Sequence, residues 1–132
     1  MRVLLATDAD WIHDEVDAAL ADDTTEVHRV RRGVDVLEAV RTLDPEFVVL
    51  DLQIGNCGGV ATSLLLRQEE ATGRLGRRAI VLLLDRAADV FLARTAGADG
   101  WLVKPLDSLR LRRAMTRTLA GEAYVEGSAA AS

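Results

Sequence analysis

Cysteine is nearly absent from this chain of 132 residues, which contains Cys57 alone. A single cysteine cannot form a disulfide within the chain, so the composition fits a reducing compartment such as the cytoplasm. Long hydrophobic runs are lacking as well, since the run 80–84 is far shorter than the roughly 20 residues of a membrane-spanning helix. The first residues lead straight into a strand-like segment, so we expect no secretory leader. The expectation is a cytoplasmic protein without disulfides or a membrane span.

The chain also lacks an excess of positive charge, because its formal net charge is -5. Affinity for nucleic acid depends on neutralising phosphates with cations, so we do not expect the chain to bind nucleic acid directly. Lysine is scarce: of the 16 basic residues only Lys104 is a lysine. Its compact ammonium group offers a point charge that arginine does not, which makes this position worth following.

What is present is an ordinary globular mixture, with 49% hydrophobic and 28% charged residues. The length corresponds to about one domain, which can bury roughly two-thirds of its unfolded surface. We expect one domain over residues 1–121. Residues 122–132 end in a Gly-Ser-Ala-Ala-Ala-Ser run and are expected to form a disordered tail.

Short apolar runs alternate with stretches in which apolar residues recur at helical spacing. The apolar runs are residues 3–6, 27–30, 47–50, 80–84 and 101–103. The helical stretches are residues 12–20, 36–43, 60–65, 89–96 and 111–119. Strict alternation of strand and helix predicts an α/β fold with a parallel sheet covered on both faces. For five strands the expected architecture is a doubly wound, flavodoxin-like sheet with strand order 2-1-3-4-5.

Three charged residues stand at the carboxyl ends of the predicted strands: Asp8 after the first, Asp51 after the third and Lys104 after the fifth. The first and third strands are neighbours, so Asp8 and Asp51 should lie about 5 Å apart. Two carboxylates that close repel each other unless a cation intervenes, and oxygen ligands at an open edge suit Mg²⁺. An extended Lys104 side chain can bridge most of the roughly 10 Å to Asp51. Together these groups would neutralise charge on a phosphoryl group.

Each of these residues also has a purely structural interpretation. Aspartates after strands often form loops or cap helices, and Asp10 is well placed to cap the first helix. Asp107 or Ser108 would cap the last helix in the same way. The coincidence of three charged residues at the ends of the correct strands favours a functional site.

Two segments then carry a resemblance to a known family: residues 47–52 (FVVLDL) and residues 96–105 (AGADGWLVKP). Over about residues 2–120 the chain resembles the receiver domain of two-component response regulators of the chemotaxis and sporulation type. The resemblance implies that Asp51 is the phosphoacceptor and that Lys104 contacts the phosphoryl group. It also implies a Mg²⁺ site formed by Asp8, Asp51 and the backbone carbonyl of Gln53.

The resemblance further implies a cis peptide bond before Pro105 and an aromatic switch residue, here Trp101, that changes rotamer. The chain departs from the family pattern at several positions, including Gly55 and Gly58 in the loop after the third strand, and three departures bear directly on the site. Thr7 replaces the first residue of the acidic pair, which removes a charge that helps to hold the metal. Leu84 stands where a switch hydroxyl is usual, and Asp85 where a small residue is usual. We therefore expect weak Mg²⁺ binding and little movement of Trp101 on phosphorylation.

Three hypotheses follow from these observations. The first is a stand-alone receiver, not an enzyme, that accepts a phosphoryl group on Asp51 from a histidine kinase or phosphotransfer protein and signals to a downstream protein. The second is an atypical receiver that acts as an interaction module without phosphorylation. The third is a phosphohydrolase of the haloacid-dehalogenase type, because Asp8-Ala-Asp10 follows an apolar strand.

Other features receive simpler interpretations. The fourth helix, fifth strand and fifth helix, with the arginines of residues 110–117, form a candidate face for a homodimer or a partner. His13 and His28 lack metal-ligand spacing with each other or with Cys57, so we expect surface or partly buried positions. Cys57 is expected to be an inert loop thiol.

Overall fold

The structure of the protein, a computed structural model, describes residues 1–55 and 58–126. Cys57 and the end of the expected tail, residues 127–132, lie outside the described residues. The strands are β1 (Arg2–Ala6), β2 (Glu26–Val30), β3 (Phe47–Asp51), β4 (Ala79–Leu84) and β5 (Gly100–Val103). The α-helices are α1 (Asp10–Leu20), α2 (Val36–Leu43), α3 (Gly59–Ala71), α4 (Val90–Thr95) and α5 (Ser108–Leu119). Two single-turn 3₁₀ helices precede α2 and α4: η1 (Gly33–Asp35) and η2 (Ala87–Asp89).

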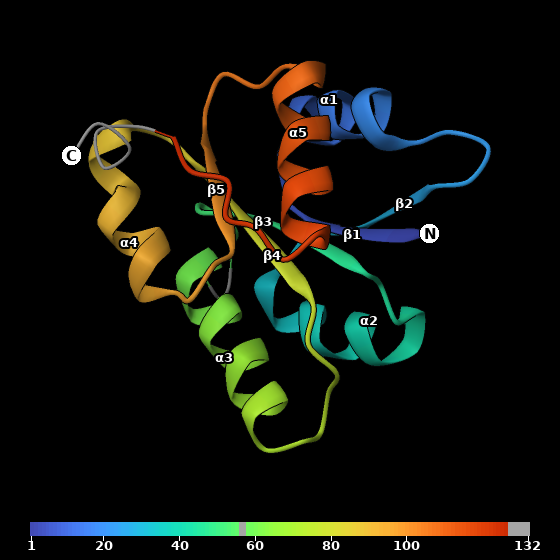
Figure 1. The fold of residues 1–132 in the computed structure, drawn as a ribbon, viewed down its shortest axis with the longest axis vertical. Helices are drawn as coiled ribbons and strands as arrows, with labels where there is room; N and C mark the ends of the chain where they lie inside the picture. Colours follow the sequence, from blue (N-terminus) through green and yellow to red (C-terminus); the bar gives the residue numbers. More distant parts are fainter. Residues whose placement is uncertain (56–57, 127–132) are drawn as a thin grey trace.

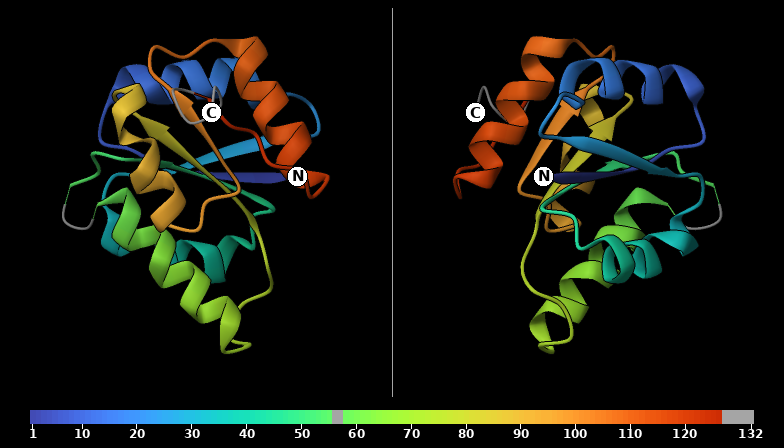
Figure 2. Two further views of the ribbon diagram at one scale, coloured as in Figure 1. Left: turned by 60° about the vertical axis from the view of Figure 1, so that its left-hand side comes forward. Right: turned by 90° about the vertical axis from the view of Figure 1, so that its right-hand side faces the viewer.

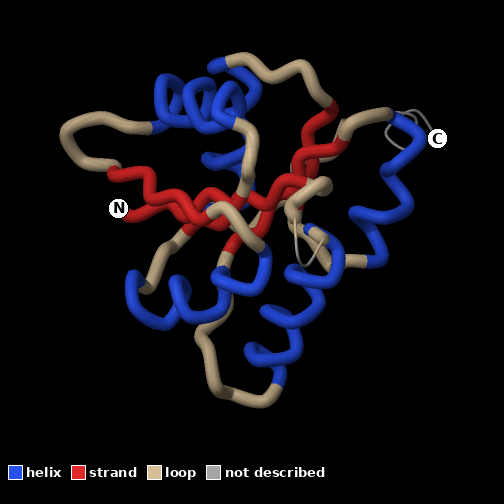
Figure 3. Tube along the Cα trace, turned by 180° about the vertical axis from the view of Figure 1, so that it is seen from behind, coloured by secondary structure: helices blue, strands red, loops and turns tan. Residues whose placement is uncertain are grey.

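The strands form one parallel sheet in the order β2-β1-β3-β4-β5, which confirms the predicted doubly wound α/β fold. Helices α1 and α5 cover one face of the sheet, and α2, α3 and α4 cover the other (Figure 1). The same layers are visible when the molecule is turned (Figure 2) and when it is seen from behind (Figure 3). None of the helices in the described part of the chain has both the length and the apolar character that a membrane span needs.

The central strands are apolar throughout because both of their faces are covered. β3 and β4 are buried at every position. Since side chains alternate along a strand, Val48 and Leu82 belong to the hydrophobic cluster with α2, α3 and α4, while Val49 and Leu83 belong to the cluster with α1 and α5. The continuous apolar runs in the sequence reflect this two-sided burial.

The helix N-termini follow the sequence prediction at α5 but not at α1. Asp107 caps α5, where its carboxylate accepts a hydrogen bond of 2.9 Å from the Arg110 amide. The predicted cap at Asp10 is wrong, because Ala9 is the N-cap of α1 and Asp10 is its first helical residue. The Asp10 carboxylate pairs with Arg29 at 2.8 Å instead, so a cation near β2 engages the oxygens that capping would need.

Residues 122–126, which we call the C-terminal strap, differ from the expected disordered tail. The chain reverses at Gly121, whose φ is 85°, and the strap then runs back along β5 (Figure 1). Tyr124 forms a parallel bridge with Gly100 of β5. Because β5 is an edge strand with main-chain groups that need partners, a short polar segment can be ordered there without any hydrophobic periodicity.

Candidate functional site

The register of the sheet decides which side chains meet Asp51. β1 and β3 pair Ala6 with Leu50, so the next residues of the two chains, Thr7 and Asp51, lie side by side at the carboxyl ends of the strands. On its other side Asp51 pairs with Leu83 of β4. Thr7 rather than Asp8 is therefore the residue of the β1 end that lies beside the Asp51 side chain.

The Asp51 carboxylate lies at the buried floor of the site, with only 3% of its side chain exposed. Its Oδ2 accepts a hydrogen bond of 2.8 Å from Thr7 Oγ1. Its Oδ1 accepts from the Gln53 amide at 3.2 Å and from Lys104 Nζ at 2.7 Å. A carboxylate removed from water needs such donors and a countercharge, and this one has both.

Thr7 is fixed as a donor to Asp51. The Ala9 amide donates to Thr7 Oγ1 at 3.1 Å, so a lone pair of the hydroxyl is already used there. A hydroxyl carries a single proton, which is left for Asp51. The position at which the family has an acid thus supplies a neutral hydrogen-bond donor in this chain.

Lys104 reaches the site from the end of β5. Its amide donates to the Leu84 carbonyl at 2.8 Å, which continues the β4–β5 pairing, and the following bond to Pro105 is cis as predicted. The ammonium bridges Asp51, at 2.7 Å, and Asp85, at 2.8 Å. Burial works to lower the pKa of Lys104, but the hydrogen bonds to the two carboxylates outweigh it and hold that pKa above its ordinary value.

Asp85 is a site residue that sequence reasoning noted only as a departure from the family pattern. Partial burial works to raise the pKa of Asp85, but hydrogen bonds with Lys104 and Gln53 outweigh it and the pKa lies below its ordinary value. The signal that could have identified its role is an acid directly after β4, beside the strand that ends in the only lysine. Asp85 therefore holds Lys104 from the side opposite Asp51.

Asp8 lies on the exposed rim of the site, together with Gln53 and Gly55. Its carboxylate forms no hydrogen bond or ion pair with any other residue among those described. A Cβ built on Gly55 would lie 3.5 Å from Asp8 Oδ2, so the loop after β3 passes close to this carboxylate. The rim thus presents a free anionic group above the buried Asp51.

The oxygen donors of this region could hold a hydrated Mg²⁺ ion, although few of them carry a negative charge. Nowhere in residues 1–55 and 58–126 do three or more His, Cys, Asp or Glu side chains group together to hold a metal. The available donors are the carboxylates of Asp8 and Asp51 and the carbonyl of Gln53. Mg²⁺ keeps several waters and needs only one or two carboxylates, so these donors suit it, with less charge than an additional acid at Thr7 would give.

The proposed switch residues Leu84 and Trp101 lie in the same buried cluster, with exposed fractions of 0% and 6%. Neither Leu83 nor Leu84 at the end of β4 carries a hydroxyl. The Trp101 indole donates from Nε1 to the carbonyl of Glu126, at 2.9 Å. Trp101 therefore occupies an inward position that the C-terminal strap holds in place.

The start of α3 also approaches the site. A Cβ on Gly59 would lie 2.7 Å from the Asp51 carbonyl oxygen, closer than side-chain carbons come to backbone atoms in proteins. The absence of a side chain therefore lets α3 begin directly against the end of β3, which fixes the backbone of Asp51.

Asp10, His13 and His28 do not join this site. Asp10, which a phosphohydrolase would use with Asp8, has its carboxylate engaged by Arg29 and Arg31 at 2.8 Å and 3.4 Å. His13 and His28 are partly buried, as expected, and their nearest acids are the exposed Asp14 and Glu26. The structure therefore concentrates the candidate chemistry on Asp51 and Lys104.

Known relatives are about one third identical to this chain over the residues that align. It is 31% identical over 104 residues to the nitrate/nitrite response regulator protein NarL of Escherichia coli (strain K12), a match that covers 79% of this chain and 47% of NarL. It is 33% identical over 126 residues to the response regulator protein PmrA of Pseudomonas aeruginosa, covering 93% of this chain and 56% of PmrA. The chain thus spans about half the length of these relatives.

Solved structures share the fold at lower sequence identity. The chemotaxis response regulator CheY4 of Vibrio cholerae superposes with a TM-score of 0.77 at 22% identity, over 89% of this chain and 97% of CheY4. A putative response regulator from Chloroflexus aurantiacus superposes with a TM-score of 0.78 at 24% identity, over 90% of this chain and 97% of its own.

The family assignment comes from the sequence as a whole. The model of the response regulator receiver domain matches residues 3–116, a span that includes every candidate site residue from Thr7 to Lys104. This match confirms the resemblance first seen in the segments around Asp51 and Lys104. The chain belongs to the response regulator receiver domain family.

Proposed function

We propose that Asp51 accepts a phosphoryl group from a histidine kinase or a phosphotransfer protein. Receiver domains of this family are signalling modules that interact with such proteins, and phosphorylation on aspartate is standard among them. The observation that carries the proposal is the 2.7 Å contact between Lys104 Nζ and Asp51 Oδ1, since it sets a permanent cation beside one particular carboxylate.

In the proposed reaction an Asp51 oxygen attacks the phosphorus of a phosphohistidine. An O–P bond forms, the N–P bond breaks, and its electron pair stays on the imidazole nitrogen, which takes up a proton from water. Lys104 offsets negative charge on the phosphoryl oxygens as the group is transferred. Thr7 and the Gln53 amide orient the carboxylate through their hydrogen bonds to its two oxygens.

The metal site proposed for this reaction uses Asp8, Asp51 and the Gln53 carbonyl. Receiver domains generally bind Mg²⁺ at the phosphorylation site, where the ion supplies positive charge to the phosphoryl group. Two features of the chain support a weak site: Asp8 is exposed and unpaired among the described residues, and Thr7 is neutral.

We further propose that this receiver acts in the cytoplasm and signals by contact with a downstream protein. The single cysteine supports a reducing compartment. The net charge of -5 supports a protein partner rather than nucleic acid. The face formed by α4, β5 and α5 is the proposed surface for that partner or for a homodimer.

The experiment is exposure of the purified chain to a small phosphodonor with Mg²⁺, followed by intact mass measurement and mapping of the modified residue. We expect one added phosphoryl group, located on Asp51 and absent from Asp51→Asn. Asp23→Asn is the matched control, because Asp23 is exposed in the loop between α1 and β2 and its side chain forms no hydrogen bond or ion pair among the described residues. No adduct on the wild type, or an adduct that persists in Asp51→Asn, would contradict the proposal.

A second candidate function is a receiver that works as an interaction module without phosphorylation. The hydrogen bond from Thr7 to Asp51 Oδ2 favours it, because it occupies an oxygen that a metal or phosphorus atom would need. Leu84 favours it too, since no hydroxyl at the end of β4 can follow a phosphoryl group. An unmodified wild-type chain at saturating phosphodonor and Mg²⁺ would support this alternative.

A further inference from the structure

The C-terminal strap adds a short stretch of strand pairing to the edge of the sheet. The Trp101 amide donates to the Tyr124 carbonyl at 2.8 Å, and the Tyr124 amide donates to the Asp99 carbonyl at 3.3 Å. These are the main-chain contacts by which an extended peptide joins an exposed strand. They satisfy groups of β5 that would otherwise lack strand partners.

β5 is shaped to receive this segment. A Cβ on Gly100 would lie 2.6 Å from the Tyr124 carbonyl oxygen, which is too close for any side chain. The strap can therefore approach only because β5 begins with glycine. The short distance between Gly100 and Tyr124 therefore depends on the sequence of β5 as well as on the strap.

After Tyr124, the next residue of the strap that forms hydrogen bonds with β5 and α5 is Glu126. Its main-chain carbonyl accepts from Trp101 Nε1 at 2.9 Å, while its Oε1 accepts from the Val103 amide at 3.0 Å. Its Oε2 accepts from Arg110 Nε at 2.8 Å and from the Tyr124 hydroxyl at 2.9 Å. The carboxylate thus takes the place of a backbone carbonyl opposite Val103 and meets a cation from α5.

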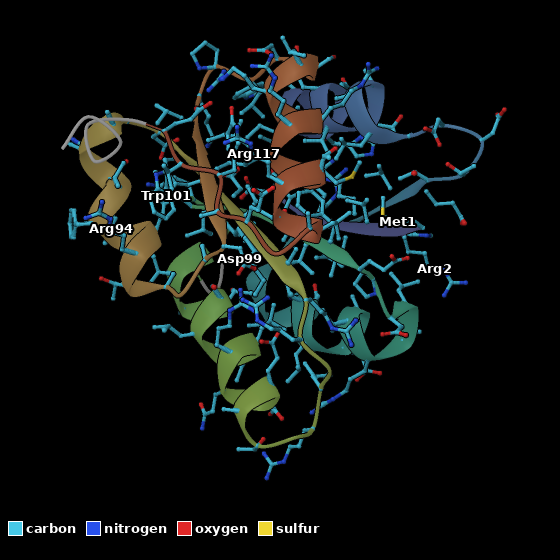
Figure 4. The ribbon with its side chains drawn as sticks, viewed as in Figure 1. Met1, Arg2, Arg94, Asp99, Trp101 and Arg117 are labelled. Atoms are coloured by element: carbon cyan, nitrogen blue, oxygen red, sulfur yellow. The ribbon has the colours of Figure 1, made fainter. Side chains whose placement is uncertain are left out.

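Arg110 is held for this contact by its own environment. Its guanidinium also donates to the carbonyls of Val103 and Pro105, at 2.9 Å and 2.8 Å. Two helical turns further along α5, the Arg117 guanidinium lies 5.9 Å from the centre of the Tyr124 ring, within the range of a cation–π contact. Figure 4 shows Trp101 and Arg117 on opposite sides of the segment that runs along β5.

We propose that the β5 edge, with Arg110 and Arg117, is a docking site for an extended segment that carries an aromatic side chain followed two residues later by a carboxylate. The chain fills this site with its own Tyr124 and Glu126. The strap therefore competes with any partner segment of the same chemistry and covers Trp101 until it is displaced. This inference concerns the β5 edge and does not depend on phosphorylation of Asp51.

A strap that only protected the edge strand from aggregation would account for the main-chain hydrogen bonds, but not for the side-chain contacts. It would not require a carboxylate at one position, an aromatic ring two residues before it, or two arginines to meet them. A tethered segment also has a high effective concentration at its site, so a free peptide should fail to compete until the strap is weakened. These two points separate specific docking from simple edge cover.

The test uses the full chain carrying Tyr124→Ala and Glu126→Ala, which leaves β5 and both arginines intact. Glu122→Ala is the control, because Glu122 is exposed and its side chain forms no contact among the described residues. We expect the double variant, but not the control, to show a red-shifted Trp101 emission and shifted amide resonances of Trp101 and Val103. An unchanged spectrum in the double variant would overturn the proposal.

The second arm adds a peptide of sequence Glu-Ala-Tyr-Val-Glu with blocked ends. We expect saturable binding to the double variant, restoring the Trp101 and Val103 resonances, and at least tenfold weaker binding to the wild type. A peptide with alanine in place of Tyr and the last Glu should not bind, and adding Arg110→Gln to the double variant should weaken binding at least tenfold. Equal binding to wild type and double variant, equal binding of the alanine peptide, or aggregation without saturable binding would each overturn the proposal.

Discussion

Asp51 lies between two neighbours of opposite character. Toward β5, Lys104 places a positive charge 2.7 Å from one carboxylate oxygen, and Asp85 holds that ammonium at 2.8 Å from its far side. Toward β1, Thr7 offers a hydroxyl at 2.8 Å from the other oxygen, and the neighbouring acid Asp8 is exposed. The side of Lys104, which we call the lysine side, therefore carries its charges in contact, whereas the side of Thr7 and Asp8, which we call the metal side because Mg²⁺ is proposed to bind there, has a neutral residue at position 7.

The difference between the two sides has an energetic meaning. A unit charge about 4 Å from a carboxylate near a protein surface interacts with it by roughly 4 kcal/mol. A neutral hydrogen bond contributes about 1 kcal/mol. Neutralisation of Asp51 therefore depends mainly on Lys104, and the metal side should be the one that added charge can improve.

Removing the lysine side should have the largest effect. Lys104→Ala should lower the rate of Asp51 phosphorylation by a small phosphodonor by about 10²-fold or more, because it deletes the cation that contacts the carboxylate. The measurement is the initial rate of adduct formation followed by mass.

Lys104→Arg is the matched control for that variant. It retains the charge in a planar rather than a compact group, so its rate should fall between those of the wild type and Lys104→Ala. A Lys104→Ala rate within threefold of the wild type would mean that the lysine side does not carry the reaction.

Leu84→Thr tests the buried residue at the end of β4, beside Lys104. The residue is fully buried, so the smaller, polar side chain should lower the free energy of unfolding by about 2–4 kcal/mol, measured by urea denaturation. With a beryllofluoride phosphoryl mimic, the variant should gain a change in Trp101 emission that the wild type lacks, because the hydroxyl can follow the bound group. Leu84→Met keeps the volume without a hydroxyl and should stay silent. A mimic-induced change in the wild type as large as in Leu84→Thr would contradict this account.

The lysine side shows how far the sequence could predict the site. Asp51 and Lys104 interrupt apolar runs at strand ends, and a lysine is long enough to cross one strand, so their meeting could be predicted. For Asp85 the sequence offers only its position after β4, because the contact with Lys104 itself depends on the rotamer of one flexible side chain. The pairing of Thr7 with Asp51 required the β1–β3 register, which apolar runs do not define to one residue.

In the fold, too, some elements could be predicted from the sequence and others could not. Buried strands and amphipathic helices leave periodic patterns, so the sheet order and the elements could be predicted from the sequence. The C-terminal strap could not, because five residues are too few to show a periodicity, and its contacts use main-chain groups and the side chains of Tyr124 and Glu126. The predicted cap at Asp10 failed, and its Oδ1 instead accepts a hydrogen bond from Arg29, which is distant in sequence.

Thr7→Asp should restore part of the metal side. The added carboxylate beside Asp51 should raise the affinity for Mg²⁺ by about tenfold, which corresponds to roughly 1.4 kcal/mol. The measurement is a titration followed by Trp11 fluorescence and by thermal denaturation with and without Mg²⁺. Thr7→Asn has the same shape without the charge and should leave the affinity close to that of the wild type. An equal gain in both variants would show that charge is not the missing feature.

The pH dependence of the Lys104–Asp85 pair should give the smallest effect. The pKa of Asp85 is lowered, so its contribution to stability is present above the unfolded value of about 3.9 and is lost as the pH falls through the lower folded pKa. The pKa of Lys104 is raised, so its contribution is present below about 10.4 and is lost as the pH rises through the higher folded pKa. Between those limits the contribution should be constant.

Asp85→Asn isolates this pair. Its urea midpoint should lie slightly below that of the wild type from about pH 5 to pH 9, by an amount that does not change with pH, and the gap should close in strong acid. The effect should be small because 35% of the Asp85 side chain is exposed. A gap that changes between pH 6 and pH 8 would assign the stability to another titrating group.

The most direct test of the difference between the two sides is the Mg²⁺ dependence of Asp51 phosphorylation. The yield of adduct on Asp51 would be measured against Mg²⁺ concentration in the wild type and in Thr7→Asp, with the same small phosphodonor. A complete lysine side and a depleted metal side predict that both chains are modified on Asp51, and that the wild type needs about tenfold more Mg²⁺ for half of its maximal rate. No adduct on the wild type at saturating Mg²⁺, or the same Mg²⁺ dependence in both chains, would contradict it.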